Sequence, residues 1–130
     1  MAKPTECPKE APNEATIIFK ILNRDTWAAA LEKQFFAGAP VDVADGYIHF
    51  STAGQLSETA AKHFHGQPDL LVVAFRAGAL GEMLRWEPSR GGKLFPHLYC
   101  PLNTALALWT EPMPLDKDGT PMLPERVTQC

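Results

Sequence analysis

The 130-residue sequence lacks the features that would assign it to a membrane, secreted or metal-binding class. No run approaches the ~20 apolar residues that a membrane-spanning helix needs, and the first residues have no apolar core typical of a signal peptide. The cysteines Cys7, Cys100 and Cys130 are odd in number and form no Cys-x-x-Cys pair. This pattern argues against a disulfide framework and a structural zinc site. We therefore expect a cytoplasmic protein with no membrane association.

The sequence also lacks a basic run. Twelve Lys and Arg residues are dispersed among fifteen Asp and Glu residues, which gives a formal net charge of −3. Proteins that bind the phosphate backbone of duplex nucleic acid carry a basic stripe, so we expect no stable duplex binding. A small phosphate-bearing ligand remains compatible with this charge, because one or two basic side chains are enough to bind it.

What the chain does contain is the composition of one globular domain, with 45% hydrophobic and 21% charged residues. Residues 1–15 hold three prolines and no apolar periodicity, which predicts a disordered N-terminal arm. Residues 114–130 are also rich in proline and are expected to form an extended C-terminal tail. The folded domain is predicted to span 16–113.

Apolar patterns within 16–113 indicate an α+β fold. Strands are predicted at 16–22, 47–51, 69–75, 94–100 and 104–110. A helix after Asn23 would present Trp27, Leu31 and Phe35 to the core. This order, with short connections, favours a mixed or antiparallel sheet with helices on one side.

A second helix is predicted to begin directly after the strand at 47–51. Thr52-x-x-Gln55 matches a capping box, and Leu56, Ala60 and Phe64 would form the buried stripe. In a regular strand, Tyr47, His49 and Ser51 share one face. Together with Thr52 and the free N–H groups of the helix start, they could bind an anionic or polar ligand. The alternative is that His49 is a satisfied core residue and Thr52 only a helix cap.

The segment 85–92 is the second candidate region. It combines Trp86, Glu87 and Arg90 with the two glycines Gly91 and Gly92. Glycines allow a backbone to approach a ligand closely, and arginine binds phosphate through two parallel hydrogen bonds. A surface hairpin with an Arg–Glu pair is the competing interpretation.

His97 and Tyr99 lie two residues apart and are expected on one face of a strand. Histidine titrates near neutral pH, so His97 could relay a proton or bind a ribose hydroxyl. A packed structural pair is the alternative. No local spacing such as His-x-x-x-His accompanies His49, His97 and Glu87, and we therefore predict no metal site.

The segments Phe19–Leu22, Asp45–Thr52, Arg85–Gly92 and Phe95–Tyr99 together resemble a small bacterial family of unknown function, the one numbered 952. The resemblance covers about residues 16–113. It implies an ADP-ribosyltransferase-like architecture, which is a curved, split α+β sheet with a cleft that binds NAD in the enzymes.

In ADP-ribosyltransferases a polar residue on the first strand corresponds to Lys20, and a Gly-Tyr-Phe-Ser-like strand corresponds to 45–51. The usual Glu on a late strand has no counterpart in Phe95–Tyr99. The resemblance thus implies a divergent ADP-ribosyl or phosphate-transfer enzyme. RNA 2′-phosphotransferases, which place basic and His residues around a phosphate in this architecture, are an analogy of fold.

Together these observations predict a site for NAD, ADP-ribose or a related nucleotide between 47–52 and 85–99. In this hypothesis Lys20 and Arg90 neutralise phosphate, while His49, Ser51 and Thr52 bind ribose or phosphate oxygens. Trp86 or Tyr99 is predicted to stack on a ring of the ligand, and Tyr47 to line the binding face. The catalytic candidates are His97, Glu87 and His49. The alternatives are a non-catalytic binding or interaction module and a hydrolase of a small phosphorylated metabolite. The substrate, the reaction and the oligomeric state stay open.

Overall fold

The computed structural model describes residues 14–129, except for the side chains of Arg90, Thr128 and Gln129. The expected N-terminal arm therefore lies almost wholly outside the described residues. In chain order the elements are β1 (Ile17–Asn23), α1 (Arg24–Lys33), β2 (Phe35–Phe36), α2 (Pro40–Asp45), β3 (Ile48–His49), β4 (Ser51–Thr52), α3 (Ala53–His63), β5 (Leu70–Arg76), the 3₁₀ segment η1 (Ala77–Met83), β6 (Leu84–Pro88), η2 (Arg90–Gly92), β7 (Leu94–Leu98), β8 (Leu102–Asn103), η3 (Thr104–Leu106), β9 (Trp109–Met113) and α4 (Glu125–Gln129).

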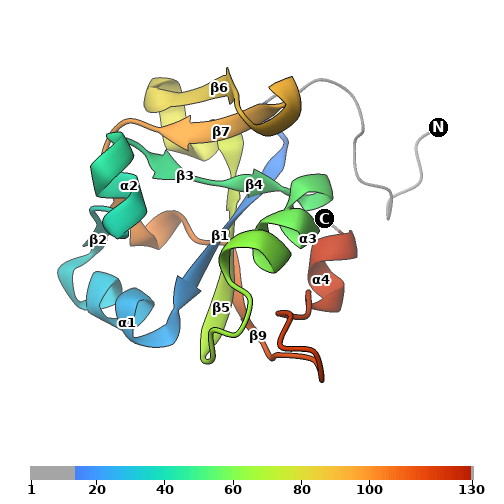
Figure 1. The fold of residues 1–130 in the computed structure, drawn as a ribbon. Helices are drawn as coiled ribbons and strands as arrows, with labels where there is room; N and C mark the ends of the chain where they lie inside the picture. Colours follow the sequence, from blue (N-terminus) through green and yellow to red (C-terminus); the bar gives the residue numbers. More distant parts are fainter. Residues whose placement is uncertain (1–13, 130) are drawn as a thin grey trace.

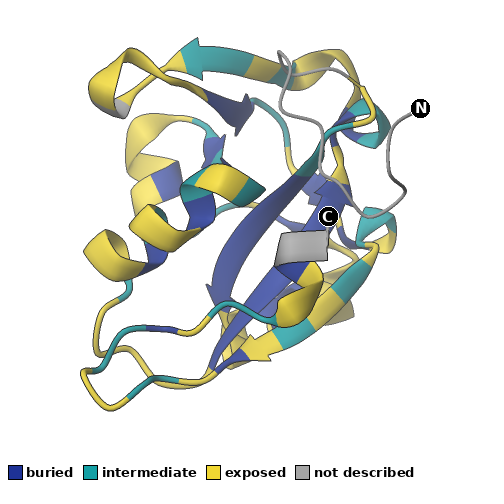
Figure 2. Ribbon diagram, turned by 90° about the vertical axis from the view of Figure 1, so that its right-hand side faces the viewer, coloured by how far each residue is buried: buried dark blue, intermediate teal, exposed yellow. Residues whose placement is uncertain are grey.

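The largest sheet has the strand order β4-β1-β5-β9, and all its pairings are antiparallel. Alternation along β1 sends Ile18 and Leu22 into one apolar cluster and Phe19 and Ile21 into another on the opposite face. Helices cover both faces, so β5 is buried over Leu70–Phe75, as its apolar run predicts. Figure 2 shows these buried strands between more exposed helices.

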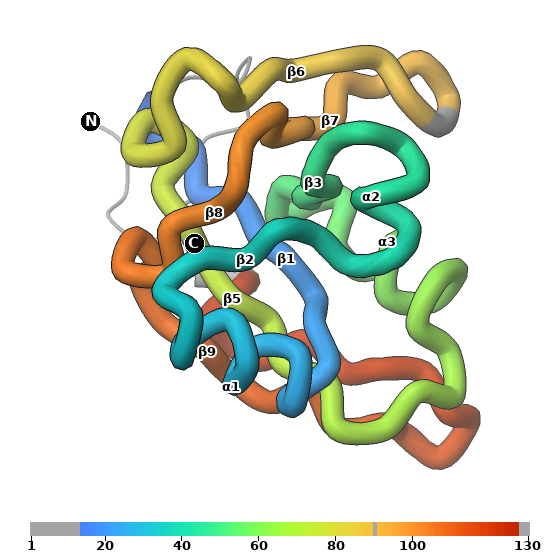
Figure 3. Tube along the Cα trace, turned by 90° about the vertical axis from the view of Figure 1, so that its left-hand side faces the viewer, coloured from blue at the N-terminus to red at the C-terminus, as the bar shows by residue number. Residues whose placement is uncertain are grey.

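A second sheet of order β3-β7-β6 lies across the end of the first (Figures 1 and 3). The strand expected at 47–51 is divided between the two sheets. Ile48 and His49 pair with β7, whereas Ser51 and Thr52 pair with β1. The change occurs at Phe50, whose N–H donates to the carbonyl of Pro96 at 3.0 Å. The segment that the sequence singles out is thus the bridge between the sheets.

The second helix begins where its capping box predicts. The Thr52 N–H donates to Oε1 of Gln55 at 3.0 Å, and Leu56 and Ala60 are buried against β1 and β5. In the first helix only Trp27 of the expected stripe is buried, while Leu31 and Phe35 are about half exposed. The helix ends at Lys33 with Gln34 at a positive φ, and this turn sends Phe36 into the core instead.

The C-terminal expectation is corrected. After β9, the chain forms the isolated bridge Leu115–Pro121 and then α4. Val127 is fully buried in the cluster beneath α3, and burial of such a side chain contributes about 1.5–3 kcal/mol. The guanidinium of Arg126 lies 4.7 Å from the Trp109 ring centre. The segment after 113 is therefore part of the domain, and the strand expected at 104–110 occurs at 109–113.

These elements confirm an α+β domain with antiparallel sheets. Within residues 14–129, no helix has the length and apolarity needed to cross a membrane.

Candidate functional site

The sheet formed by β3, β7 and β6 has one apolar and one polar face. Its register aligns His49 with His97 and His97 with Arg85. Alternation then places six residues on the same face, which we call the polar face: Tyr47, His49, Arg85, Glu87, His97 and Tyr99. The opposite face carries Ile48, Leu98 and Trp86, which pack on the main core cluster. Trp86 therefore lies away from the site, which corrects its predicted stacking role.

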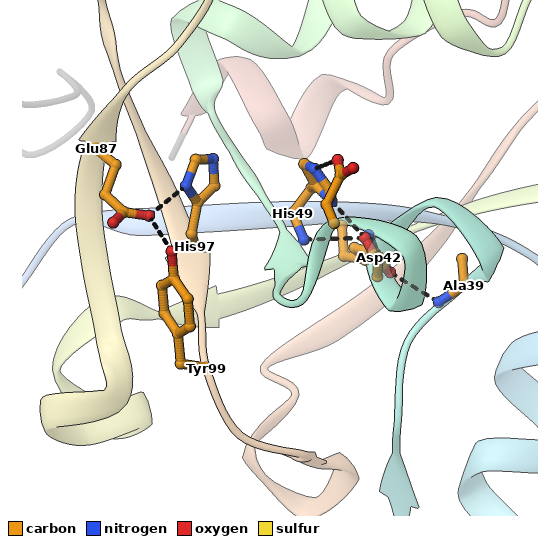
Figure 4. A network of polar contacts seen from close by, with 8 residues as sticks. Ala39, Asp42, His49, Glu87, His97 and Tyr99 are labelled. Atoms are coloured by element: carbon orange, nitrogen blue, oxygen red, sulfur yellow. Dashed lines mark hydrogen bonds and ion pairs between the residues drawn. The ribbon is translucent and has the colours of Figure 1, made fainter.

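On the polar face, Glu87 contacts both His97 and Tyr99 (Figure 4). Nδ1 of His97 is 2.8 Å from Oε1 of Glu87, and the Tyr99 hydroxyl donates to the same oxygen at 2.7 Å. Hydrogen bonds from Tyr99 and His97 lower the pKa of Glu87. Burial lowers the pKa of His97, although Glu87 opposes this effect. These causes favour a neutral imidazole beside an ionised carboxylate.

The other ring nitrogen of His97 is not contacted by Glu87. Nε2 of His97 has no hydrogen-bond partner among the described residues. Among the same residues, no side-chain nitrogen or oxygen is both fully buried and unpaired. With Nδ1 donating to Glu87, Nε2 carries the lone pair. His97 can therefore accept a proton at Nε2.

His49 contacts two carboxylates from α2. Nδ1 is 2.6 Å from Oδ1 of Asp42, and Nε2 is 2.9 Å from Oδ2 of Asp45. The backbone N–H of His49 also donates to Asp42, at 3.1 Å. Asp42 and Asp45 are three residues apart on a helix, so they lie on the same side of α2.

Asp42 is the most heavily engaged polar residue of this region. Lys20 Nζ lies 2.9 Å from each carboxylate oxygen, and the Ala39 N–H donates to Oδ2 at 2.8 Å, as in the carboxylate half of a capping box. Burial alone would raise the pKa of Asp42. The hydrogen bond from His49, the charge of Lys20 and two backbone N–H groups outweigh it and lower the pKa to about 2.

Lys20 is buried with Asp42, which changes its expected role. Burial lowers the pKa of Lys20, while the charge and hydrogen bond of Asp42 oppose that effect. The Lys20 charge is already neutralised inside the protein, so Lys20 does not supply a free cation for phosphate. The sequence hypothesis is corrected on this point.

Tyr47 joins the two histidines. Its ring stacks on His97 with centroids 4.1 Å apart and lies 4.6 Å from the centroid of His49. The two imidazoles are themselves 5.6 Å apart and nearly perpendicular. Burial, with the charges of Asp45 and Glu87, raises the pKa of Tyr47. His49 and His97, one from each candidate segment, thus meet around one phenol ring.

A cleft of about 680 Å³ opens beside this cluster. Its walls include four of the predicted binding residues, Lys20, Tyr47, His49 and Ser51, together with Asp45. It runs along β1 from Phe19 to Asn23. Because β4 pairs only with Ile18 and Phe19, the edge of β1 is uncovered beyond Phe19. Phe50, Phe64 and Phe95 add apolar surface.

The remaining predicted residues do not line the cleft. Thr52 serves as the helix cap, and Glu87, His97 and Tyr99 lie behind Tyr47. The side chain of Arg90 lies outside the described part, although the neighbouring Ser89 reaches the cleft wall. Across the described residues, no group of three or more His, Cys, Asp or Glu side chains could hold a metal ion.

Sequence reasoning missed Asp42 and underrated Asp45. Pro40 followed by an acid at the third helical position is a helix-start signal that could have marked Asp42. Its pairing with Lys20 joins residues 22 positions apart and has no local sequence signal.

Comparisons with known proteins agree with this architecture. A family described as "Protein of unknown function (DUF952)" matches residues 21–110. The crystal structure of protein CC0527 from Caulobacter crescentus is 48% identical, with a TM-score of 0.84, and the match covers 86% of this chain and 98% of that one. The solution NMR structure of CC0527 is 50% identical, with a TM-score of 0.74 and coverage of 81% and 90%. No curated protein matches the sequence.

Proposed function

The chain belongs to the DUF952 family, whose function is unknown, and we propose that its cleft binds a phosphate-bearing small molecule of the nucleotide or ADP-ribose type. The observation that carries this proposal is the meeting of two imidazole–carboxylate pairs at Tyr47, beside a cleft of about 680 Å³. A mostly apolar cleft with a few convergent polar groups is the usual form of a small-molecule site.

The cleft offers separate surfaces for the parts of such a ligand. Tyr47 presents a ring for stacking, and His49 presents an imidazole that can donate hydrogen bonds. Ser51 is buried and shares a 3.0 Å hydrogen bond with Thr59, so it acts from the floor. The passage of residues 48–52 between two sheets supports an ADP-ribosyltransferase-like assignment, and NAD is therefore among the proposed ligands.

The two histidines have different chemical roles in this proposal. His97 is the general base, because burial lowers its pKa and Nε2 has no hydrogen-bond partner among the described residues, with Glu87 orienting the ring. His49 is the hydrogen-bond donor to the ligand, because Asp42 fixes its ring through Nδ1. His97 reaches the ligand only if Tyr47 moves, since Tyr47 lies between it and the cleft wall.

Ligand-observed NMR tests the proposal with NAD, ADP-ribose and a 2′-phosphorylated nucleotide. Binding is expected at millimolar or lower ligand concentration, weakened about tenfold in His49→Gln through loss of a charged hydrogen bond. Glu32→Gln, on the exposed side of α1, is the control and should bind like the wild type. No binding of any of the three ligands by a verified folded protein would overturn the proposal.

A non-catalytic interaction module is the second candidate, favoured by the burial of Asp42 and Lys20 in a fully paired cluster. In that case His49 connects its sheet to β1 through Asp42 and Lys20, and His97 connects β7 to β6. His49→Ala and His97→Ala would then lower the free energy of unfolding while changing no ligand affinity. An effect on affinity larger than the effect on stability favours the ligand site.

A further inference from the structure

One contact in the cleft is unexplained by folding alone, namely the approach of Asp45 to His49. Asp45 is the last residue of α2, and its side chain is 46% exposed. Gly46 follows at a φ of 88°, so the chain turns immediately after it. The carboxylate nevertheless lies against the cleft wall, with Oδ2 2.9 Å from Nε2 of His49.

The contacts of His49 define the protons on its ring. A ring nitrogen must carry a proton to donate to a carboxylate, and His49 faces Asp42 at Nδ1 and Asp45 at Nε2. A neutral imidazole has one N–H, so two such hydrogen bonds require the imidazolium. Both contacts can therefore be hydrogen bonds at once only when His49 is a cation between two anions.

The charges of the four groups balance in pairs. Lys20 and Asp42 neutralise one another in the interior, at 2.9 Å. His49 and Asp45 form the second pair, at the cleft wall. Rotation of the Asp45 side chain into solvent would leave one uncompensated positive charge, with its N–H directed into the cleft. The group best suited to replace Asp45 is another oxyanion.

We infer that Asp45 is a built-in competitor that occupies the ligand position at Nε2 of His49, and that the ligand replaces it with a phosphate oxygen. Asp42 fixes the opposite nitrogen, so it is a positioning residue that directs Nε2 toward the cleft. The identity of the ligand rests on the proposed function; the competition itself does not. An exposed carboxylate is cheap to displace, because water solvates it once it leaves.

The test uses the full chain, labelled with ¹⁵N, and titrates inorganic phosphate and ADP-ribose separately. Wild type is compared with Asp45→Ala, which removes the competitor, and with Glu32→Ala, which removes an acid on the far side of α1. We expect Asp45→Ala to bind both probes about tenfold more tightly, the size of a lost charged competitor. Glu32→Ala should match the wild type.

Imidazole ¹⁵N resonances provide a readout that does not depend on a ligand. In Asp45→Ala without ligand, the Nε2 signal of His49 should move while the Nδ1 signal, held by Asp42, stays in place. Addition of phosphate should then shift Nε2 again.

The outcomes separate the inference from the proposed function. If both proteins bind ADP-ribose equally well, the competition is wrong and the ligand site stands. An unchanged Nε2 signal in Asp45→Ala would also overturn the competition. If Nε2 moves but neither protein binds phosphate or ADP-ribose, the oxyanion assignment falls together with the proposed function.

Discussion

In each of the two imidazole–carboxylate pairs a carboxylate contacts Nδ1 of a histidine, but the burial of the two members is opposite. In the first, Asp42 is 1% exposed and the side chain of His49 is 32% exposed. In the second, the side chain of His97 is 5% exposed and that of Glu87 is 34% exposed. The first pair thus buries its anion and the second buries its neutral ring.

This difference in burial distinguishes the residue of each pair that stabilises the fold strongly from the residue that stabilises it little. Asp42 connects Lys20 of β1, Ala39 before α2 and His49 of β3, so three elements depend on one carboxylate. Glu87 binds only its neighbours on the polar face. We expect the buried member of each pair to govern stability and the exposed member to contribute little to it.

The largest expected effect comes from Asp42→Ala. It leaves the buried Lys20 ammonium and two backbone N–H groups without their acceptor, and breaking a buried ion pair costs about 3–5 kcal/mol. Urea unfolding measures the loss. The matched change Asp45→Ala removes an exposed carboxylate from the same helix and should cost about 1 kcal/mol or less. Similar losses in the two variants would contradict the contrast in burial.

The next largest expected effect is a dependence of the free energy of unfolding on pH. The pKa of Asp42 is about 2 in the folded protein, against an ordinary value of 3.8. Because the pKa is lower in the folded protein, the ionised Asp42 stabilises the fold fully above pH 3.8. This stabilisation is lost as the pH falls towards 2. The difference between the two pKa values corresponds to about 2 kcal/mol in the free energy of unfolding.

Urea unfolding from pH 6 to pH 2 tests this dependence, with Asp42→Asn as the reference. The advantage of the wild type over that variant should shrink by about 2 kcal/mol below pH 3.8. His97 acts in a separate window, because its lowered pKa makes stability fall as pH drops below 6.5. A constant advantage across the acid range would refute the assignment to Asp42.

Sequence reasoning predicted what depends on local pattern. The capping box predicted the start of α3, the apolar run predicted β5, and alternation placed His97 and Tyr99 on one face. These features depend on neighbours two to four positions away, so the chain itself reveals them.

The errors concern long-range contacts. Lys20 looked like a free cation because Asp42, its partner, is 22 residues away. Trp86 looked available because the pairing of β6 with β7, which sets its face, was unknown. The proline content after Met113 predicts an extended tail, whereas Pro121 and Val127 are buried in the structure. Tertiary packing decided all three.

A smaller effect is expected from Tyr47, which links the two pairs. Tyr47→Ala removes the stack on His97 and should cost about 1 kcal/mol of stability, the usual value of an aromatic contact. It should also weaken ADP-ribose binding about tenfold, if a ring of the ligand stacks there. Tyr47→Phe keeps the ring and is the control for calorimetry. Equal affinity in the Ala and Phe variants would remove Tyr47 from the site.

The smallest change in stability is expected from Glu87→Gln, because Glu87 is the solvent-accessible member of its pair. The unfolding midpoint should stay at the wild-type value, whereas the imidazole of His97 should respond. Glu87 raises the pKa of His97 against the effect of burial, so its neutral replacement should lower that pKa further. NMR titration of His97 measures the shift, with Glu82→Gln on η1 as a charge control. A large loss of stability with an unchanged pKa of His97 would reverse the roles assigned to the two members of this pair, and the proton-accepting role of His97 would lose its support.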